Sequence, residues 1–391
     1  MAFWDIFRKK ESRTNVAIVL NALSYRRLSD QEIMVRGYKE VPYIHAGINL
    51  IARAIANLDY QIVDDSGSPV EGTQLEKLWK NPNPFEAQSA FLKAVVISLL
   101  ISGNAFIEIV RAGNRIIELY NLNPLRMVVK AGERKGIVDS YEYRAGAQTV
   151  VFDPSEIIHI KLFNLFDDFL GLSPLIVLKD IIEQYLAIKE LQNSLLQNGM
   201  RPSGAFVTQD PLTEEQYQRL KAELYRYTGP ANAGRPLILE GGLDWKPLSM
   251  SPQEFDWVTA EKLILRAIAV TLGVAPELIG EPEFKTYSNF QEANRQFYMN
   301  TVVPLAELIL EEFNRALEPT FKYRIAIDYD SIDALQEEYS EVWKRAIEGV
   351  KAGILTPNEA RAMLGYEPVK GGDYTLVSAN LVPMGVDLDE D

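Results

Sequence analysis

Residues 156–175, EIIHIKLFNLFDDFLGLSPL, contain the change from strand to helix on which the predicted architecture depends. The isoleucines within 157–162 predict a short strand. Ser173 and Pro174 predict the start of a helix, with the serine as N-cap and the proline at the first helical position. The apolar pattern then continues until Gly199, so a long helix is expected to follow the strand.

The segment before this stretch has the pattern of a mixed unit. Ser29-Asp30-Gln31-Glu32 is a capping box, helical spacing of isoleucines predicts a helix over 41–57, and an apolar run predicts another over 86–102. Short strands are expected over 60–63, 105–111, 115–120, 127–130, 140–144 and 149–152. We therefore expect the fold class α+β, with a small antiparallel sheet packed on helices.

A smaller α/β module is expected over 200–251. It would contain strands at 205–208 and 236–239 and a charged helix that starts at the capping residue Thr213. Ser251-Pro252-Gln253-Glu254 then predicts the start of a second long helix, which ends at Gly273.

The C-terminal third is expected to be mostly helical. A long helix is predicted from Ser288 to about Leu317, with a kink at Pro304, because proline removes one helical hydrogen bond and clashes with the preceding turn. A strand over 321–329 and two short helices after 332 follow, and the chain ends in an acidic run over 387–391.

The helices that follow Ser173 and Ser251 are apolar on more than one side. A helix of this kind must be covered on several faces. From the pattern alone, burial within one chain is favoured, and the alternative is a ring in which each helix lies between its own chain and a neighbour.

Composition excludes several classes of function. The chain has 391 residues, enough for two or three units, and a net charge of −14, which is the wrong sign for an ordinary DNA-gripping protein. It has no cysteine and two histidines, so disulfides, thiol nucleophiles and multi-His metal sites are excluded.

We expect no cofactor, no metal and no catalytic residue, because nucleotide-binding, hydrolase and metalloprotease motifs are absent. No apolar run is long enough to span a membrane.

A few residues keep a catalytic alternative open. Glu281, Glu283 and Lys285 resemble the carboxylates and lysine of a metal-dependent nuclease, but a solvated loop is the favoured interpretation. Asp328 and Asp330 would lie on one face of a strand end, where solvation is again favoured over a cation site.

Both histidines are interpreted as structural. His159 has apolar neighbours on a strand and His45 lies between apolar residues on a helix, so a hydrogen-bonded role is favoured over catalysis for each. The Phe and Trp residues near the N-terminus are interpreted as a tail that docks on a surface rather than as a membrane anchor.

Taken together, the ordered motifs resemble the portal proteins of tailed double-stranded DNA phages, in the short form common among siphophages. The resemblance covers about residues 41–367. It rests on weak motifs that occur in the expected order: the helix 41–57, Asn81-Pro82-Asn83-Pro84, Ser102-Gly103-Asn104-Ala105-Phe106, the stretches 156–161 and 170–175, Asn198-Gly199-Met200-Arg201-Pro202-Ser203-Gly204, and Gly273-Val274-Ala275-Pro276-Glu277-Leu278-Ile279-Gly280.

The resemblance implies a portal fold and a division into regions. These would be an N-terminal tail (1–24), a wing (25–172), a first stem helix (173–199), a clip (200–251), a second stem helix (252–274), a tunnel loop (275–288), a kinked channel helix (289–318), a returning wing strand (319–331), a short crown (332–370) and an acidic C-terminal tail (371–391).

The resemblance also implies a function and partners, and it favours the ring over burial in one chain. The ring, a dodecamer in the virion, would be a passive channel for packaging and ejection of double-stranded DNA at one capsid vertex. Its partners would be the large terminase subunit, the major capsid protein and scaffold, and the head-tail connector, in the virion and in the host cytoplasm during assembly. A portal of a gene-transfer agent or prophage relic is one alternative, and a metal-dependent phage nuclease is the other.

Within this picture the tunnel loop supplies the candidate DNA-channel residues. Lys285 and Tyr287 would touch DNA transiently, while Glu277, Glu281 and Glu283 would prevent tight binding through like-charge repulsion. Pro304 would set the kink of the channel helix.

Overall fold

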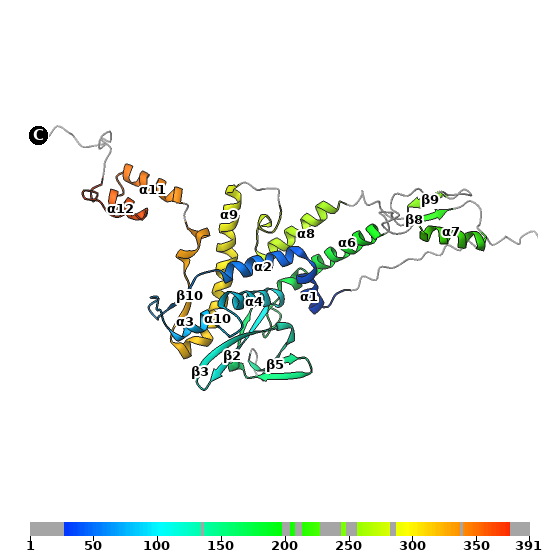
Figure 1. Ribbon diagram of the computed structural model, residues 1–391, viewed down its shortest axis with the longest axis horizontal. Helices are drawn as coiled ribbons and strands as arrows, with labels where there is room; N and C mark the ends of the chain where they lie inside the picture. The colour runs from blue at the N-terminus through cyan, green and yellow to red at the C-terminus, as the bar shows by residue number, and fades with distance from the viewer. Residues whose placement is uncertain are drawn as a thin grey trace, which may run out of the picture.

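The computed structural model describes residues 27–133, 137–197, 204–207, 213–226, 244–247, 256–281, 287–336 and 339–375. Figure 1 shows a central body from which α6 and α8 extend toward a small module of α7, β8 and β9, while α11 and α12 form a separate pair on the other side. The predicted N-terminal tail and most of the acidic C-terminal tail lie outside the described residues.

The body begins with the helices that the sequence predicts. It contains α1 (Asp30–Glu40), α2 (Pro42–Ala56), β1 (Tyr60–Val63), α3 (Gln74–Lys80) and α4 (Gln88–Ser102), of which α3 was not predicted. The capping box at Ser29 is formed, with both of its hydrogen bonds to Glu32 present. The isoleucines of α2 are completely buried, which confirms the helical spacing: Ile44, Ile48, Ile51 and Ile55.

The strands form separate antiparallel sheets rather than the single sheet expected. One sheet has the order β3-β2-β7 and another has the order β4-β5-β6, while β1 pairs with β10. The bounds are β2 (Asn104–Ala112), β3 (Arg115–Leu122), β4 (Met127–Ala131), β5 (Val138–Ala145), β6 (Gln148–Phe152) and β7 (Ile157–Lys161). Short 3-10 turns that begin at Pro124 and Pro154 separate the two three-stranded sheets along the chain, because each proline interrupts the extended backbone.

The helix predicted from Ser173 is divided in two. α5 (Pro174–Val177) ends at Leu178, and α6 (Lys179–Gln197) follows. Ser173 caps α5 as predicted, since its hydroxyl accepts a hydrogen bond from the Leu175 N–H at 3.1 Å. The same hydroxyl donates to the Ile101 carbonyl at 2.6 Å, so the cap also joins this helix to α4.

In the part of the chain that the structure describes, the second long helix begins at Trp257. α8 (Trp257–Leu272) is capped by Asp256, whose side chain accepts from the Thr259 N–H, and it ends at Gly273 in the left-handed conformation. The predicted start at Ser251 lies outside the described residues.

The small module pairs β8 (Gly204–Val207) with β9 (Asp244–Pro247), next to α7 (Glu214–Arg226). The sequence did not predict β9, and the strand predicted over 236–239 lies outside the described residues. Of the described helices, none is both long and apolar enough to cross a membrane.

The remaining elements return to the body and then leave it. They are α9 (Tyr287–Phe297), a π-helical turn (Tyr298–Val302), α10 (Val303–Phe321), β10 (Arg324–Ile327), α11 (Tyr339–Lys351) and α12 (Pro357–Met363). The predicted strand over 321–329 is too long, because α10 continues to Phe321 and Asp328 caps a 3-10 turn just after β10. Asp328 and Asp330 therefore do not share a strand face, which corrects the sequence-based interpretation.

Candidate channel and subunit interface

The helices α6 and α8 are attached to the body at one end and to each other. Lys189 on α6 donates to Glu261 on α8 at 2.6 Å, and this hydrogen bond raises the pKa of Lys189. The Lys189 ammonium also lies 5.3 Å from the centre of the Tyr185 ring. The second contact lies within α6, so it is the Lys189–Glu261 ion pair that joins the two helices.

A close approach of α2 and α8 anchors this unit. A Cβ atom on Gly47 would lie 2.7 Å from Cδ1 of Leu272, so a larger residue at position 47 would force the Leu272 side chain at the end of α8 to move. The Thr301 hydroxyl donates to the Gly273 carbonyl at 2.5 Å and connects the same end of α8 to the π-helical turn.

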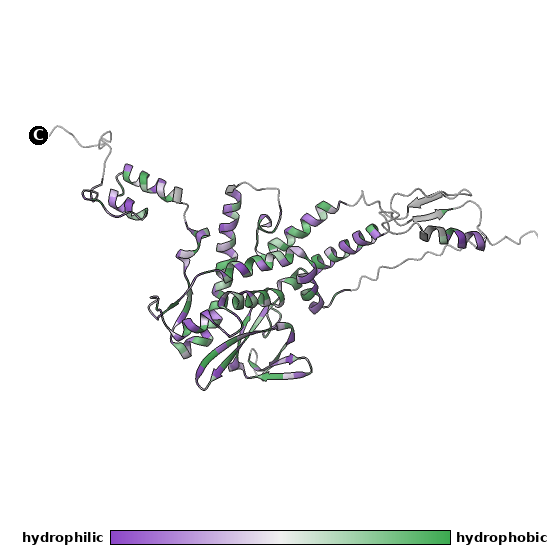
Figure 2. Ribbon diagram, in the orientation of Figure 1, coloured by the Kyte–Doolittle hydropathy of each residue, from purple (hydrophilic) through white to green (hydrophobic). Residues whose placement is uncertain are grey.

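One face of α8 has apolar side chains that nothing in the described chain covers. Leu263 is 61% exposed and Val270 is 78% exposed. They are seven residues apart and lie on the side of the helix opposite the buried Ile264 and Ile268. Figure 2 shows hydrophobic residues along α8 where it extends from the body.

The outer half of α6 is also uncovered. Its buried residues end at Tyr185, although Leu191 and Leu196 are large and apolar and are 49% and 57% exposed. The chain itself therefore buries only part of each apolar helix, and the remaining apolar surface is of the kind that subunit interfaces cover.

A loop between β7 and α5 presents further apolar side chains. Phe163, Leu165 and Phe166 are 84%, 77% and 87% exposed. Isolated exposed apolar residues are common, but three in four positions are typical of an interaction surface. We call residues 162–170 the aromatic loop.

Hydrogen bonds hold the aromatic loop in one conformation. The Asn164 amide donates to the Leu170 carbonyl at 2.9 Å and accepts from the Phe166 N–H at 3.0 Å. Asp167 accepts from the N–H groups of Phe169 and Leu170 at 2.7 and 3.0 Å. Because the loop is already ordered, little conformational entropy remains to be lost when a partner covers its side chains.

Within the predicted tunnel loop, Glu281 forms an ion pair with a residue of α8. Arg266 on α8 binds the Glu281 carboxylate through Nη2 at 2.6 Å and Nε at 3.1 Å. Glu281 is only 5% exposed, so the interpretation of this residue as a solvated loop carboxylate is wrong. Its charge is balanced by Arg266, which the sequence did not pair with it because the two residues lie on different elements.

The other tunnel-loop candidates are only partly described. Glu277 is half-buried in a 3-10 turn (Pro276–Leu278). Glu283 and Lys285 lie outside the described residues, and Tyr287 is described only as the first residue of α9. Their roles therefore stay predictions.

The interruption near Pro304 has the form of a π-helical turn. This turn covers Tyr298–Val302, and Pro304 lies in the first turn of α10 that follows. The missing N–H of proline is tolerated where the helical hydrogen-bond register changes.

His159 lies in a hydrogen-bonded cluster. Its Nε2 lies 3.0 Å from Oδ1 of Asn104, and its Nδ1 lies 3.3 Å from the Tyr141 hydroxyl. Nε2 therefore donates to the Asn104 oxygen, and in the neutral imidazole Nδ1 accepts from the Tyr141 hydroxyl. Burial, with smaller contributions from Lys161 and Arg315, lowers the pKa of His159 to about 3.

The structural interpretation of His159 is confirmed, and that of His45 stays a prediction. His45 is exposed on α2, and its ring lies 4.7 Å from the ring of Tyr38. In the part of the chain that the structure describes, no group of three or more acidic or histidine side chains is placed to hold a metal ion.

The comparisons with known proteins agree with this geometry. The family model described as "Phage portal protein" matches residues 42–365. The chain belongs to the phage portal protein family. A probable portal protein of Streptomyces phage phiC31 is 27% identical over 85% of this chain and 76% of its own length.

Two further relatives extend the comparison. An uncharacterized protein of Rickettsia bellii is 32% identical over 95% of this chain and 99% of its own length. A chain in the neck of a native gene transfer agent (GTA) particle, computed with C12 symmetry, is 33% identical, covers 87% of this chain and 94% of its own, and has a TM-score of 0.63. The nuclease alternative has no support from these matches, and the mixed helical and antiparallel fold is that of portal proteins, as in the crystal structure of an HK97-family phage portal protein from Corynebacterium diphtheriae.

Proposed function

We propose that copies of this chain close into a twelve-membered ring that forms the passive channel for double-stranded DNA at one vertex of a capsid. The observation that carries the proposal is the uncovered apolar surface of α6, α8 and the aromatic loop. A ring covers such surface, because each subunit presents one side to the neighbour that follows and the other side to the neighbour that precedes it. The C12 symmetry of the neck that contains a relative supports the number twelve.

The charge of the chain suits a conduit. DNA must slide without being held, and lysine-rich walls would bind phosphates through release of counterions. The net charge of −14 avoids this attraction. In the ring, Lys285 and Tyr287 would touch DNA briefly, and Glu277 and Glu283 would keep binding weak. Glu281 contributes less repulsion than the sequence implied, because Arg266 neutralises it.

The regions of the chain would then have separate tasks. The body that contains α1 to α4 and the sheets would be the wing, α6 and α8 the stem, the β8–β9 module with α7 the clip, and α11 with α12 the crown. The clip would face the terminase during packaging and the head-tail connector later, and the wing would meet the capsid protein and scaffold.

The experiment that tests the ring is imaging of the purified full chain by negative stain, together with native mass spectrometry. The proposal expects closed rings with an axial hole. A species that stays monomeric under all assembly conditions, including with capsid protein and scaffold present, would overturn it. A ring with a number of subunits other than twelve would correct the number and leave the channel in place.

The test of the channel residues is separate. Lys285→Ala in the assembled particle should change DNA packaging or retention. Packaging and retention equal to those of the parent would remove Lys285 from the channel role, and the ring would be unaffected.

A gene-transfer-agent particle is the second candidate setting. The specific observation in its favour is the 33% identity to the GTA neck chain, compared with 27% to the phage phiC31 protein. Sequencing of the DNA inside purified particles separates the two settings. Mixed fragments of the host chromosome indicate a gene transfer agent, and one repeated genome indicates a phage.

A further inference from the structure

The pair of helices α11 and α12 has an incomplete core. Ala346 and Ala360 are its buried hydrophobic side chains among the described residues, at 1% and 7% exposure. Two alanines bury little apolar area, so the pair gains little stability by itself. Larger apolar side chains of the same region remain exposed: Trp343, Ile347, Ile354, Tyr366, Val369 and Tyr374.

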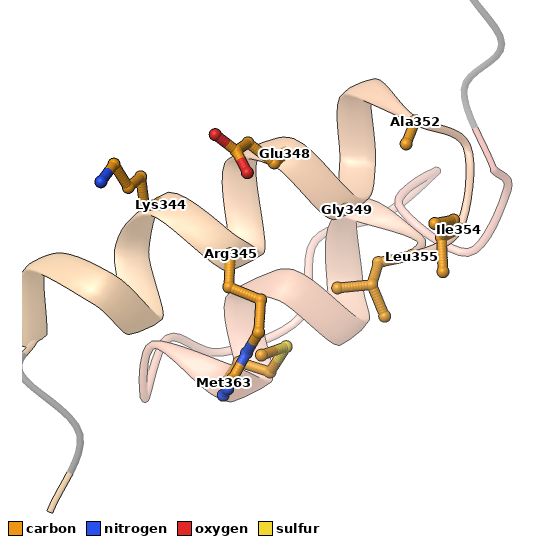
Figure 3. A pocket seen from close by; sticks show the side chains of 8 residues that line it. All are labelled: Lys344, Arg345, Glu348, Gly349, Ala352, Ile354, Leu355 and Met363. Carbon is orange, nitrogen blue, oxygen red and sulfur yellow. The ribbon is translucent and has the colours of Figure 1, made fainter.

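An open groove of about 610 Å³ lies on this pair. Apolar side chains of Ala352, Ile354, Leu355 and Met363 contribute to its lining, and three charged residues complete it: Lys344, Arg345 and Glu348. Figure 3 shows Leu355 between the two helices and Arg345 beside Met363, away from Glu348. The groove therefore combines an apolar floor with positive charge at one end.

The described chain ends next to this groove. Asn358, in the first turn of α12, donates to Asp373 at 2.7 Å, and its N–H donates to the Gly372 carbonyl at 2.9 Å. These bonds place residues 372–373 against α12. The remaining residues, 376–391, would span roughly 50 Å when extended, which is ample to return along a short helix pair.

The sequence of residues 376–391 combines apolar side chains, which could cover the apolar floor of the groove, with acidic side chains opposite in charge to Lys344 and Arg345. It reads LVSANLVPMGVDLDED, with apolar residues throughout and four acidic residues at the end. Val386 and Leu388 alternate with Asp387 and Asp389. An extended segment of this kind presents apolar side chains on one side and carboxylates on the other.

We propose that residues 381–391 dock in the α11–α12 groove of the same chain and complete its core. The apolar side chains of Val386 and Leu388 would cover Leu355 and Met363, and the acidic end would lie beside Arg345 and Lys344. Glu348 carries the opposite charge, so the acidic end is directed toward Arg345. This proposal does not depend on the ring.

The test compares hydrogen exchange in the full chain with a chain that ends at Thr375. Amides of residues 344–355 should exchange at least tenfold more slowly in the full chain. Equal exchange rates of residues 344–355 in the two chains overturn the proposal. This holds also if a neighbouring copy covers the groove in both chains, because the tail then does not contribute. Native mass spectrometry of the same samples reports the ring, so failure of the ring and failure of the tail contact are distinguishable.

Two further measurements define the contact. A full-length variant with Asp387→Asn, Asp389→Asn, Glu390→Gln and Asp391→Asn keeps the apolar side chains and should lose most of the protection. When the full chain is mixed with an excess of the truncated chain, the slow amide exchange of residues 344–355 in the full chain should not change, because the tail that covers the groove belongs to the same chain. Protection that survives neutralisation of the acids, or that falls on dilution, contradicts docking of the acidic tail in its own groove.

Discussion

The side-chain oxygen of Asn104 accepts a hydrogen bond from the Gly171 N–H at 2.7 Å, although the two residues are 67 positions apart. The same oxygen accepts from His159 at 3.0 Å. The carbonyl of the preceding residue, Gly103, accepts from the Leu162 N–H at 2.9 Å. The start of β2 and the segment before α5 are therefore joined by backbone approach as well as by side chains.

Gly171→Ala should destabilise the body by about 3 kcal/mol or more. A Cβ atom at this position would lie 2.1 Å from the Gly103 carbonyl oxygen and cannot be accommodated without backbone movement. Urea unfolding at fixed protein concentration measures the change. Gly113→Ala is the matched control, because residue 113 has a φ of 61° but nothing within 4 Å, and it should cost only about 1–2 kcal/mol. Equal losses would mean that the close approach does not matter.

His159 should make stability fall as the pH decreases. Its pKa is about 3 in the folded chain and near 6.5 when unfolded, so below about pH 6.5 only the unfolded state takes up the proton. The contribution is present above pH 6.5 and is lost progressively toward pH 3, with a slope that approaches about 1.4 kcal/mol per pH unit.

The measurement is the free energy of unfolding at pH 7.5 and pH 5, in the parent and in His159→Gln. The difference between the two pH values should be smaller in the variant by up to about 2 kcal/mol. The chain has two histidines, and His45 is the exposed one. His45→Gln is therefore the control. A variant at position 159 that keeps the full pH dependence would show that another group causes it.

The double change Leu263→Asp and Val270→Asp should prevent ring closure and leave the fold of the subunit intact. Both side chains are largely exposed in the single chain, so the charges remain solvated there, whereas a neighbour would have to bury them. Native mass spectrometry should show monomers where the parent forms rings. Val151→Asp, at an exposed valine on β6, serves as a control for charge alone. Rings with the α8 variant would exclude this face from the interface.

The double change Phe163→Ser and Phe166→Ser should weaken the association of subunits by at least tenfold. Each phenylalanine side chain that a neighbouring subunit covers contributes about 1.5–3 kcal/mol to association. The thermal unfolding of the unassembled chain should not change, since both rings are exposed. Phe85→Ser removes an equally exposed ring from the segment between α3 and α4 and is the comparison. Unchanged assembly would assign the aromatic loop to a different partner.

Glu281→Gln should lower stability by about 1–2 kcal/mol, because it removes a buried charge-assisted pair whose other partner, Arg266, is still partly in water. Its effect should decrease little with salt, since Glu281 is 5% exposed. Urea unfolding in low and high salt measures both quantities. Glu277→Gln, in the same segment but half-buried, is the control. A loss that disappears in high salt would indicate an exposed pair.

Much of the fold could be predicted from local patterns. The helices at 42–56 and 88–102 and the hairpin at Gly113 follow from periodicity, caps and turn residues, because these depend on neighbours within a few positions. The end of α8 at Gly273 follows for the same reason.

The candidate site could be predicted only in part. The sequence identified two helices with more apolar surface than one face requires, but it favoured burial within one chain until the family resemblance was considered. The aromatic loop lies within the stretch 156–175, yet nothing local distinguishes an exposed phenylalanine from a buried one. Glu281 was placed in solvent because its partner lies on α8, 15 residues earlier.

The sequence by itself determined the caps and turn residues that start or end several of the helices and strands, and the order of motifs that identifies the family. Only the tertiary structure decided that Gly171 meets Asn104, that Glu281 is neutralised by Arg266, and that Leu263 and Val270 face outward. The physical reason is that caps and turns are local hydrogen bonds, whereas burial and charge balance depend on contacts between segments that are distant along the chain.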